Sequence, residues 1–226
     1  MTAAREITAK AGPTICIIDY GMGNLSSVVW ALHSLGCRAE ISNNPERIAV
    51  AEALILPGVG AFGEAMLRIR SGGLIPVLER RVFEDRVPFL GICLGMQLLG
   101  KQSTEGGIHQ GLGWIDAQVD RIPDNLAIRV PHIGWNEVAW AANSPINASI
   151  EQNSHFYFNH SFHMTMAGDG VAATTNIGEP ILAAVTKDNI WGVQFHPEKS
   201  QNNGRRLLRN FLNFISSRQP ALRHAC

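Results

Sequence analysis

Residues 88–101 read PFLGICLGMQLLGK, and this stretch decides the fold. The short apolar run before Cys93 predicts a buried strand at 88–92, and residues 96–101 predict the start of a helix. Cys93 therefore stands in the turn between them, with Gly91 and Gly95 two positions to either side. A cysteine in this setting is typical of a nucleophile elbow, in which a sharp turn holds the reactive side chain clear of the sheet.

The elbow has chemical consequences for Cys93. A helix N-terminus favours a thiolate, and the N–H of Leu94 can donate to an oxyanion that develops on a substrate. The competing interpretation is a structural cysteine at a strand end, which the flanking glycines disfavour. The remaining cysteines, Cys16, Cys37 and Cys226, form no C-x-x-C pair, so the sequence predicts neither a metal site nor a disulfide framework.

Strand-like and helix-like segments alternate on the N-terminal side of the elbow. We expect further strands at residues 14–19, 38–42 and 53–56, and helices at residues 25–35, 64–70 and 75–84. Such alternation predicts βαβ units, and therefore an α/β fold with a mostly parallel central sheet flanked by helices.

The second half of the chain changes character. Short β-like runs, such as residues 117–122 and 156–163, predict extra antiparallel strands in the same sheet or in a small side sheet. A closing helix is expected at residues 204–216, with its apolar residues on one face. We therefore predict a single domain over residues 14–218, a flexible extension at 1–13 and a tail at 219–226.

A second reactive motif, His196-Pro197-Glu198, follows the apolar run 191–195. A thiol at its ordinary pKa of about 8.5 needs a base at neutral pH, which His196 can supply while Glu198 orients the ring. H-x-E also occurs in zinc deaminases, but the P-C-x-x-C half of that signature is absent. An α/β-hydrolase triad is disfavoured because its acid precedes its histidine.

Two glycine-rich turns lie near strand ends. Pro57-Gly58-Val59-Gly60 follows a predicted strand, and its backbone N–H groups at Val59 or Gly60 can complete an oxyanion hole with Leu94; an ordinary turn is the alternative. Residues 21–26 (GMGNLS) come close to a dinucleotide fingerprint, but Ser26 replaces its third glycine. We interpret this second turn as structural, at the rim of the site.

Composition excludes several classes of protein. Apolar residues make up 46% of the chain and charged residues 17%, which favours a globular domain over a disordered chain. Lys plus Arg and Asp plus Glu are both 19, so no net charge favours nucleic acid or an anionic membrane surface. No apolar run reaches the ~18 residues that a membrane span needs, and residues 1–12 lack the apolar core of a signal peptide. We expect a cytoplasmic protein.

The motifs together resemble a known family. GICLGMQLL (91–99) and GVQFHPEKS (192–200) resemble class I glutamine amidotransferases. DYGMGNL (19–25), PGVGAF (57–62) and PHIGWN (131–136) narrow the resemblance to glutaminase subunits of imidazole glycerol phosphate synthases. The likeness covers residues 14–214, and the order Cys, His, Glu agrees. At residues 158–162 the chain has FNHSF where the family usually has an aromatic residue followed by Val-His-Ser-Tyr.

The resemblance implies roles for named residues and no cofactor. Cys93 would be the nucleophile, His196 the general base and Glu198 its orienter. The other implied roles are the oxyanion hole (Val59, Gly60, Leu94), contacts to glutamine (Gln97, His160, Ser161) and contacts to a partner (Asn24, Lys199).

The resemblance also implies a partner and a pathway. The partner would be a (β/α)₈-barrel cyclase in a heterodimer, which receives ammonia from L-glutamine. The products would be imidazole glycerol phosphate, an aminoimidazole carboxamide ribotide and glutamate, in histidine biosynthesis.

Two other functions stay open at the level of sequence. GLGWID (111–116) and NIWGVQFHPEKS (189–200) resemble a sister branch that supplies ammonia to synthetases that modify surface-polysaccharide sugars. A non-catalytic binding subunit with the same fold is the other alternative, and the intact Cys93, His196 and Glu198 argue against it.

Overall fold

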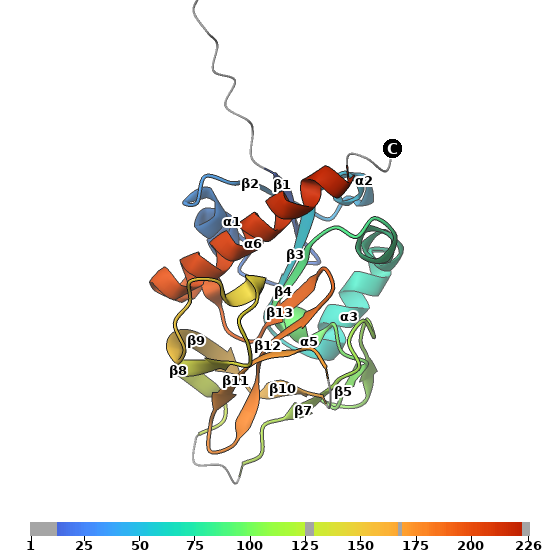
Figure 1. Ribbon diagram of the computed structural model, residues 1–226. Helices are drawn as coiled ribbons and strands as arrows, with labels where there is room; N and C mark the ends of the chain where they lie inside the picture. Colours follow the sequence, from blue (N-terminus) through green and yellow to red (C-terminus); the bar gives the residue numbers. More distant parts are fainter. Residues whose placement is uncertain (1–12, 125–128, 167–168, 223–226) are drawn as a thin grey trace, which may run out of the picture.

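The computed structural model describes residues 13–124, 129–166 and 169–222, and its centre is a nine-stranded sheet (Figure 1). Five neighbouring strands run parallel, in the order β2 (Arg38–Ser42), β1 (Thr14–Ile18), β3 (Ala53–Gly58), β4 (Phe89–Cys93) and β13 (Ile190–Val193). The sheet continues with four antiparallel strands, β12 (Pro180–Lys187), β11 (Val171–Asn176), β8 (His132–Trp140) and β9 (Ser154–His160). The predicted α/β class is confirmed.

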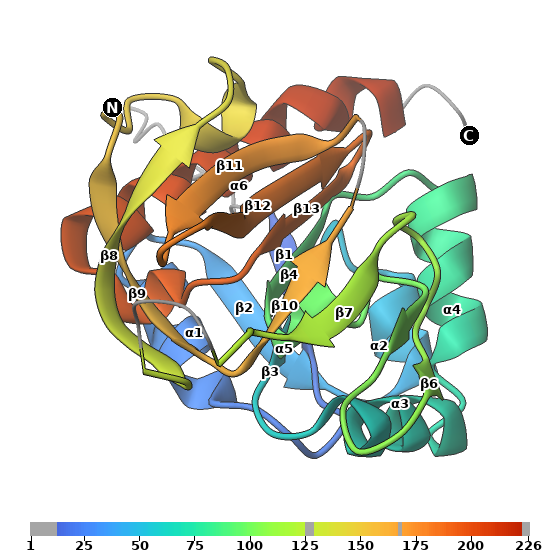
Figure 2. The same cartoon turned by 90° about the horizontal axis from the view of Figure 1, so that it is seen from below.

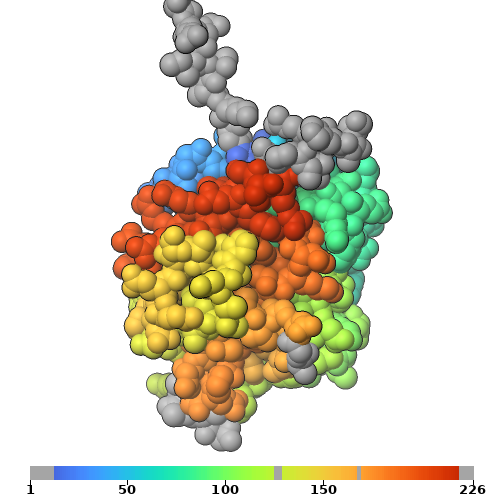
Figure 3. Space-filling view, in the orientation of Figure 1, coloured from blue at the N-terminus to red at the C-terminus, as the bar shows by residue number. Residues whose placement is uncertain are grey.

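Helices cover both faces of the parallel part. One face packs against α1 (Leu25–His33) and α6 (Gln201–Leu222). The other packs against α2 (Pro45–Ala49), α3 (Phe62–Ser71) and α4 (Ile75–Glu79), which continues as a π-helical turn (Arg80–Glu84). Figure 2 separates α1 and α6 from α2, α3 and α4, and Figure 3 shows α6 running across one face above segments of the second half of the chain.

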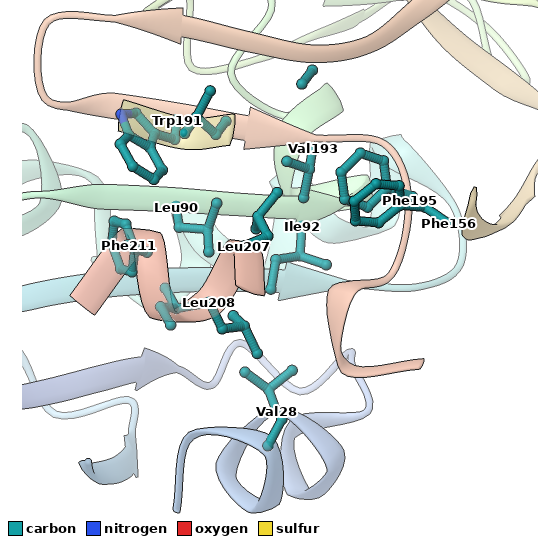
Figure 4. Packing of buried hydrophobic residues seen from close by; sticks show 14 of the residues in the cluster. Val28, Leu90, Ile92, Phe156, Trp191, Val193, Phe195, Leu207, Leu208 and Phe211 are labelled. Carbon is teal, nitrogen blue, oxygen red and sulfur yellow. The ribbon is translucent and has the colours of Figure 1, made fainter. Parts of the chain in front are cut away.

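Alternate side chains of each parallel strand enter opposite cores. In β1, Ile15 and Ile17 belong to the core under α1 and α6, whereas Cys16 and Ile18 belong to the core under α2 and α3. Figure 4 shows the first of these cores, where Leu207 and Leu208 of α6 pack against strand residues. Burial on both faces explains why these strands are continuous apolar runs in the sequence.

The second half adds strands both to the main sheet and to a side sheet, the two places that the sequence left as alternatives. Besides the antiparallel strands of the main sheet, it contributes to a small side sheet in the order β10 (Phe162–Thr165), β7 (Gln118–Arg121), β5 (Gln102–Ser103) and β6 (His109–Gln110). Two 3₁₀ turns, η2 (Pro145–Asn147) and η3 (Pro197–Lys199), complete the described elements. β10 follows β9 directly, so the two sheets meet beside the end of β9.

The helix after Cys93 differs from the prediction. It is the single turn α5 (Leu94–Gln97), not a helix over residues 96–101. The chain leaves the helix because main-chain groups of residues 98–101 bond to residues 111–117: Leu112 N donates to Leu98 O, and Lys101 N donates to Ala117 O, both at 2.8 Å. These long-range bonds replace the helical bonds that would extend α5.

The chain ends also differ from the prediction in part. Helix α6 is longer than residues 204–216, and the predicted domain limit at 218 falls inside it. Residues 1–12 and 223–226, in the predicted extension and tail, lie outside the described residues, so the domain limits stay a prediction. None of the helices in the described ranges has the length and apolar character needed to cross a membrane.

Candidate active site

Cys93 ends β4 in a backbone conformation that side chains rarely adopt. Its φ is 54° and its ψ is −110°, and the residue is 5% exposed. Strain of this kind costs about 1–3 kcal/mol and persists only where the surroundings enforce it. A Cβ on Gly91 would lie 2.6 Å from the carbonyl oxygen of Gly95, and a Cβ on Gly95 would overlap the carbonyl oxygen of Leu56. The flanking glycines therefore allow the elbow to pack against β3.

His196 and Glu198 form a buried pair. Nδ1 of His196 lies 2.8 Å from Oε1 of Glu198, and their side chains are 4% and 2% exposed. The main chain of this segment is held by Ser200, whose hydroxyl donates to His196 O at 2.6 Å and accepts from Tyr157 N at 3.0 Å. Because Glu198 occupies Nδ1, Nε2 is the nitrogen left to act on a substrate or a thiol.

The charge state of His196 is coupled to Cys93. Burial of the ring by itself lowers its pKa, but hydrogen bonding and charge interactions with Cys93 and Glu198 outweigh burial and raise the pKa of His196 to about 9. The imidazolium is therefore the favoured form of His196 beside the side chains of Cys93 and Glu198. This arrangement can activate a thiol and then return its proton to a leaving group.

A pocket of about 350 Å³ opens over Cys93 and contains most of the predicted site. It is lined by Val59, Gly60, Cys93, Leu94, Gln97, Glu105, Pro131, Asn159, His160, Ser161, Phe162 and His196. Every residue predicted for the oxyanion hole and for glutamine binding is among them, as are two of the three predicted catalytic residues. The third, Glu198, reaches the pocket only through His196.

The predicted oxyanion-hole residues converge on the thiol from two elements. Leu94 is the first residue of α5, so its N–H has no acceptor within the helix. Val59 and Gly60 follow β3, whose last residue, Gly58, pairs with Cys93 in the sheet register. Gly60 has a φ of 94°, a conformation that favours glycine.

Two buried amides are hydrogen-bonded to each other at this site, and only Gln97 is predicted from the sequence. The NH₂ of Gln97 donates to Phe162 O at 2.8 Å and to Oε1 of Gln194 at 3.0 Å. Nε2 of Gln194 in turn points at Sγ of Cys93, 3.7 Å away. Gln194 is 0% exposed. Its only signal in the sequence is a polar residue inside the apolar run 190–195.

His160 enters a chain of hydrogen bonds away from the pocket. Its Nδ1 lies 2.8 Å from Phe162 O, and its Nε2 lies 3.0 Å from Nδ1 of His132. A carbonyl only accepts, so Nδ1 of His160 carries the hydrogen; burial lowers the pKa of His160 to about 3, so the ring is neutral and Nε2 accepts. His132 then donates from Nδ1 and accepts at Nε2 from Asn136, 3.3 Å away. Any hydrogen bond from His160 to a ligand must therefore use its main chain.

Three other residues differ in their relation to the pocket. Glu105, which the motifs do not predict, lines the pocket and accepts from Phe62 N at 2.7 Å, which places it at the start of α3. Asn24 and Lys199 lie outside the pocket and are exposed; Lys199 Nζ sits 5.7 Å from the centre of the Tyr157 ring. Within the described ranges, no three His, Cys, Asp or Glu side chains are grouped as a metal ion would require.

Known proteins resemble this chain over most of its length. The family described as glutamine amidotransferase class-I matches residues 16–214. "Imidazole glycerol phosphate synthase subunit HisH 1" of Campylobacter jejuni (strain RM1221) is 42% identical, over 88% of this chain and 98% of that protein. "Imidazole glycerol phosphate synthase subunit HisH 2" of Pseudomonas aeruginosa is 44% identical, over 89% of this chain and 100% of that protein.

Solved structures share the fold. A structure described as a "putative gmp synthase subunit a protein" from Thermoplasma acidophilum superimposes with a TM-score of 0.71 at 20% identity, covering 94% of this chain and 98% of its own. A structure described as a glutamine amidotransferase gives a TM-score of 0.70 at 23% identity, covering 89% of this chain and 98% of its own. Because the family match covers residues 16–214 and the relatives from Campylobacter jejuni and Pseudomonas aeruginosa are 42% and 44% identical, the chain belongs to the class-I glutamine amidotransferase family.

Proposed function

We propose that this chain is the glutaminase subunit of an imidazole glycerol phosphate synthase, which hydrolyses L-glutamine to glutamate and ammonia. One observation carries the proposal: a strained, nearly buried Cys93 shares a pocket with His196, whose Nδ1 lies 2.8 Å from the buried carboxylate of Glu198. The names of relatives at 42–45% identity support the assignment to this synthase.

The chemistry follows from these three side chains. The thiolate of Cys93 attacks the carboxamide carbon of glutamine, and the proton that the thiol gave to His196 passes to the departing ammonia. This leaves a glutamyl thioester on Cys93. His196 then takes a proton from water, hydroxide attacks the thioester, and glutamate leaves as the thiol is restored. Glu198 holds the ring in the useful tautomer and stabilises the imidazolium.

The oxyanion of each tetrahedral intermediate needs donors. We assign these to the N–H of Leu94 and to an N–H of the loop at Val59 or Gly60, because both segments line the pocket beside the thiol. Loss of one such donor costs roughly 3–4 kcal/mol in the transition state. Glycines tolerate a peptide rotation, so turning one N–H into or out of the pocket can switch the rate by about a hundredfold to a thousandfold.

We assign glutamine binding to other residues that line the same pocket. Both N–H groups of Gln97 are used inside the protein, so its amide oxygen is the group left for the substrate. We assign the amino-acid end of glutamine to the hydroxyl of Ser161 and to main-chain groups at His160, since the ring of His160 has both nitrogens occupied.

We propose that ammonia passes to a (β/α)₈-barrel cyclase bound next to the pocket, in the cytoplasm. An exposed apolar surface adjoins the site: Ile133 and Trp135 of β8 are 58% and 47% exposed. Trp135 packs edge-on against Tyr157, which lies under Lys199 and 6.4 Å from the His196 ring. Lys199 and the exposed Trp135 thus share Tyr157 as a neighbour, which supports Lys199 as an interface residue. We also assign exposed Asn24, at the start of α1, to the interface.

The test measures glutamate release by the isolated chain, by the chain with the cyclase, and by the pair with the cyclase's nucleotide ligand. We expect a low rate alone and a large increase in the complex. Cys93→Ala should lose glutamine-dependent product formation yet support synthesis from added ammonium salt. Full activity of the isolated chain would instead indicate a stand-alone glutaminase.

The same experiment addresses the competing acceptor. A sugar-modifying synthetase would replace the cyclase as the protein that stimulates glutamate release. Co-purification of the tagged chain from its own organism identifies which of the two partners it binds. Failure of the cyclase to bind or stimulate the chain, with stimulation by the synthetase, would overturn the histidine-pathway assignment and leave the glutaminase chemistry intact.

A further inference from the structure

Tyr20, in the loop between β1 and α1, carries a buried hydroxyl that the chemistry above does not use. The residue is 6% exposed, and its hydroxyl oxygen has no hydrogen-bond partner among the described residues. A buried hydroxyl without a partner is unfavourable, because the group has lost its bonds to water and gained none in return. Such a group calls for a physical explanation.

The hydroxyl lies against the loop that supplies the oxyanion-hole donors. A Cβ built on Gly58 would overlap the oxygen of Tyr20 and would lie 2.9 Å from Cβ of Leu94. Met22, two residues further along, approaches Gly60 in the same way, with its Cε 2.8 Å from a Cβ placed there. The side chains of Tyr20 and Met22 therefore pack against Gly58 and Gly60.

Tyr20 is not among the residues that line the pocket, although its hydroxyl is close enough to Cys93 for the two groups to interact electrostatically. Val59 and Gly60 line the pocket, whereas Tyr20 belongs to the core under α3. In a trans peptide the N–H and the C=O point in opposite directions. When the peptide between Gly58 and Val59 turns its N–H toward Cys93, the carbonyl oxygen of Gly58 must therefore point away from Cys93.

We propose that Tyr20 is a positioning residue, whose hydroxyl donates to the carbonyl oxygen of Gly58 when the Val59 N–H turns into the pocket. The proposal rests on the glutaminase function proposed above. It explains both the burial and the lack of a partner among the described residues, because the hydroxyl gains its acceptor only in the turned conformation. The hydroxyl then acts on turnover through Val59 without touching glutamine.

The experiment uses Tyr20→Phe in the full chain, in complex with the cyclase and its nucleotide ligand. Thr175→Val is the matched control, because Thr175 also has a buried hydroxyl without a partner among the described residues, is 2% exposed and lies in β11 outside the pocket. The readouts are kcat and KM for glutamine in the stimulated complex and the thermal midpoint of the isolated chain.

We expect Tyr20→Phe to lower the stimulated kcat by about tenfold, the effect of losing one neutral hydrogen bond in the turned conformation. KM should stay within about twofold, since the residue does not contact substrate, and the thermal midpoint should not fall, since the lost hydroxyl had no partner. Thr175→Val should keep the wild-type kcat. A role in packing alone predicts the reverse, a lower midpoint with normal turnover.

Three results would overturn the inference. These are an unchanged stimulated kcat in Tyr20→Phe, a loss confined to KM, or a loss of kcat accompanied by a lower thermal midpoint. A wild-type chain that the cyclase does not stimulate would overturn the proposed function, and the inference with it. A stimulated wild type with an equally active Tyr20→Phe overturns the inference alone.

Discussion

Gly58, the last residue of β3, lies directly opposite Cys93, the last residue of β4, in the parallel register of the sheet. The ends of two neighbouring strands thus bring a nucleophile and a glycine-rich loop to one edge. Crevices at the carboxyl ends of parallel strands are the usual ligand sites of open α/β sheets. The pairing explains why both segments line one pocket although they are far apart in the chain.

The first prediction separates the roles of His196 and Glu198. His196→Asn should lower kcat for glutamine by at least about a thousandfold, since His196 is the base that is hydrogen-bonded to Cys93 and oriented by Glu198. Glu198→Gln should retain about tenfold to a hundredfold more activity than His196→Asn, because the amide can keep the bond to Nδ1 while losing the charge. Steady-state glutamate release by the stimulated complex measures both.

Glu198→Gln is a close test of charge because Oε2 of Glu198 has no partner among the described residues. The amide NH₂ can occupy that position while the carbonyl oxygen still accepts from His196. Ser216→Ala, an exposed change on α6, is the control and should be neutral. Equal losses in the two variants would show that Glu198 acts more directly than as an orienter.

The second prediction concerns selective labelling. A chloroketone analogue of glutamine should alkylate Cys93 and spare Cys16 and Cys37. Burial raises the pKa of Cys16 to about 12 and that of Cys37 to about 11, so both remain thiols at neutral pH. Mass spectrometry of a digest identifies the modified residue. Excess free glutamine should protect Cys93, and primary labelling at Cys37 would contradict the site.

The third prediction is an acid-induced loss of stability from the neutral His132–His160 pair. Burial lowers the pKa of both rings, that of His160 to about 3, against about 6.5 in the unfolded chain. The stabilisation is therefore fully present above pH ~6.5 and is lost as the pH falls from there toward 3. Each such histidine contributes up to about 1.4 kcal/mol per pH unit to the decrease in the free energy of unfolding as the pH falls.

Urea unfolding at pH 7, 6 and 5 measures this slope. His160→Asn should be less stable than wild type at pH 7 but should lose less stability between pH 7 and 5. His33→Gln, at an exposed position on α1, should keep the wild-type slope. A wild-type free energy of unfolding that stays constant over this range would show that the pair is not held neutral.

The fourth prediction compares two glycines. Gly95→Ala places a Cβ onto the carbonyl oxygen of Leu56, and neither backbone can move without disturbing β3 and the elbow, so we expect a loss of more than about 3 kcal/mol or failure to fold. Gly106→Ala has open space around the new Cβ but a φ of 67°, so it should cost about 1–2 kcal/mol. Circular dichroism during denaturant titration measures both, and similar costs would refute the steric argument.

Much of the fold was predictable because its signals are local. Apolar runs bounded by Gly and Pro predicted strands of the parallel part, and the glycines around Cys93 predicted the elbow. The prediction of a helix at residues 96–101 was wrong for a non-local reason. Residues 98–101 bond to residues 111–117, which a short sequence window does not contain. Helix α2 was missed although Asn44, which accepts from Glu46 N at 2.8 Å, and Pro45 are typical of a helix start.

The sequence by itself determined which residues could carry the chemistry, since a cysteine at an elbow and a histidine near a glutamate are readable from residue type and spacing. Only the tertiary structure decided how they are placed: Gln194 beside the thiol, His160 turned toward His132, and Tyr20 beneath Gly58. Each of these contacts joins segments that only the packed sheet brings together. The physical reason is that the surroundings of a buried polar group are made by neighbours from distant parts of the chain, which residue type and local spacing do not specify.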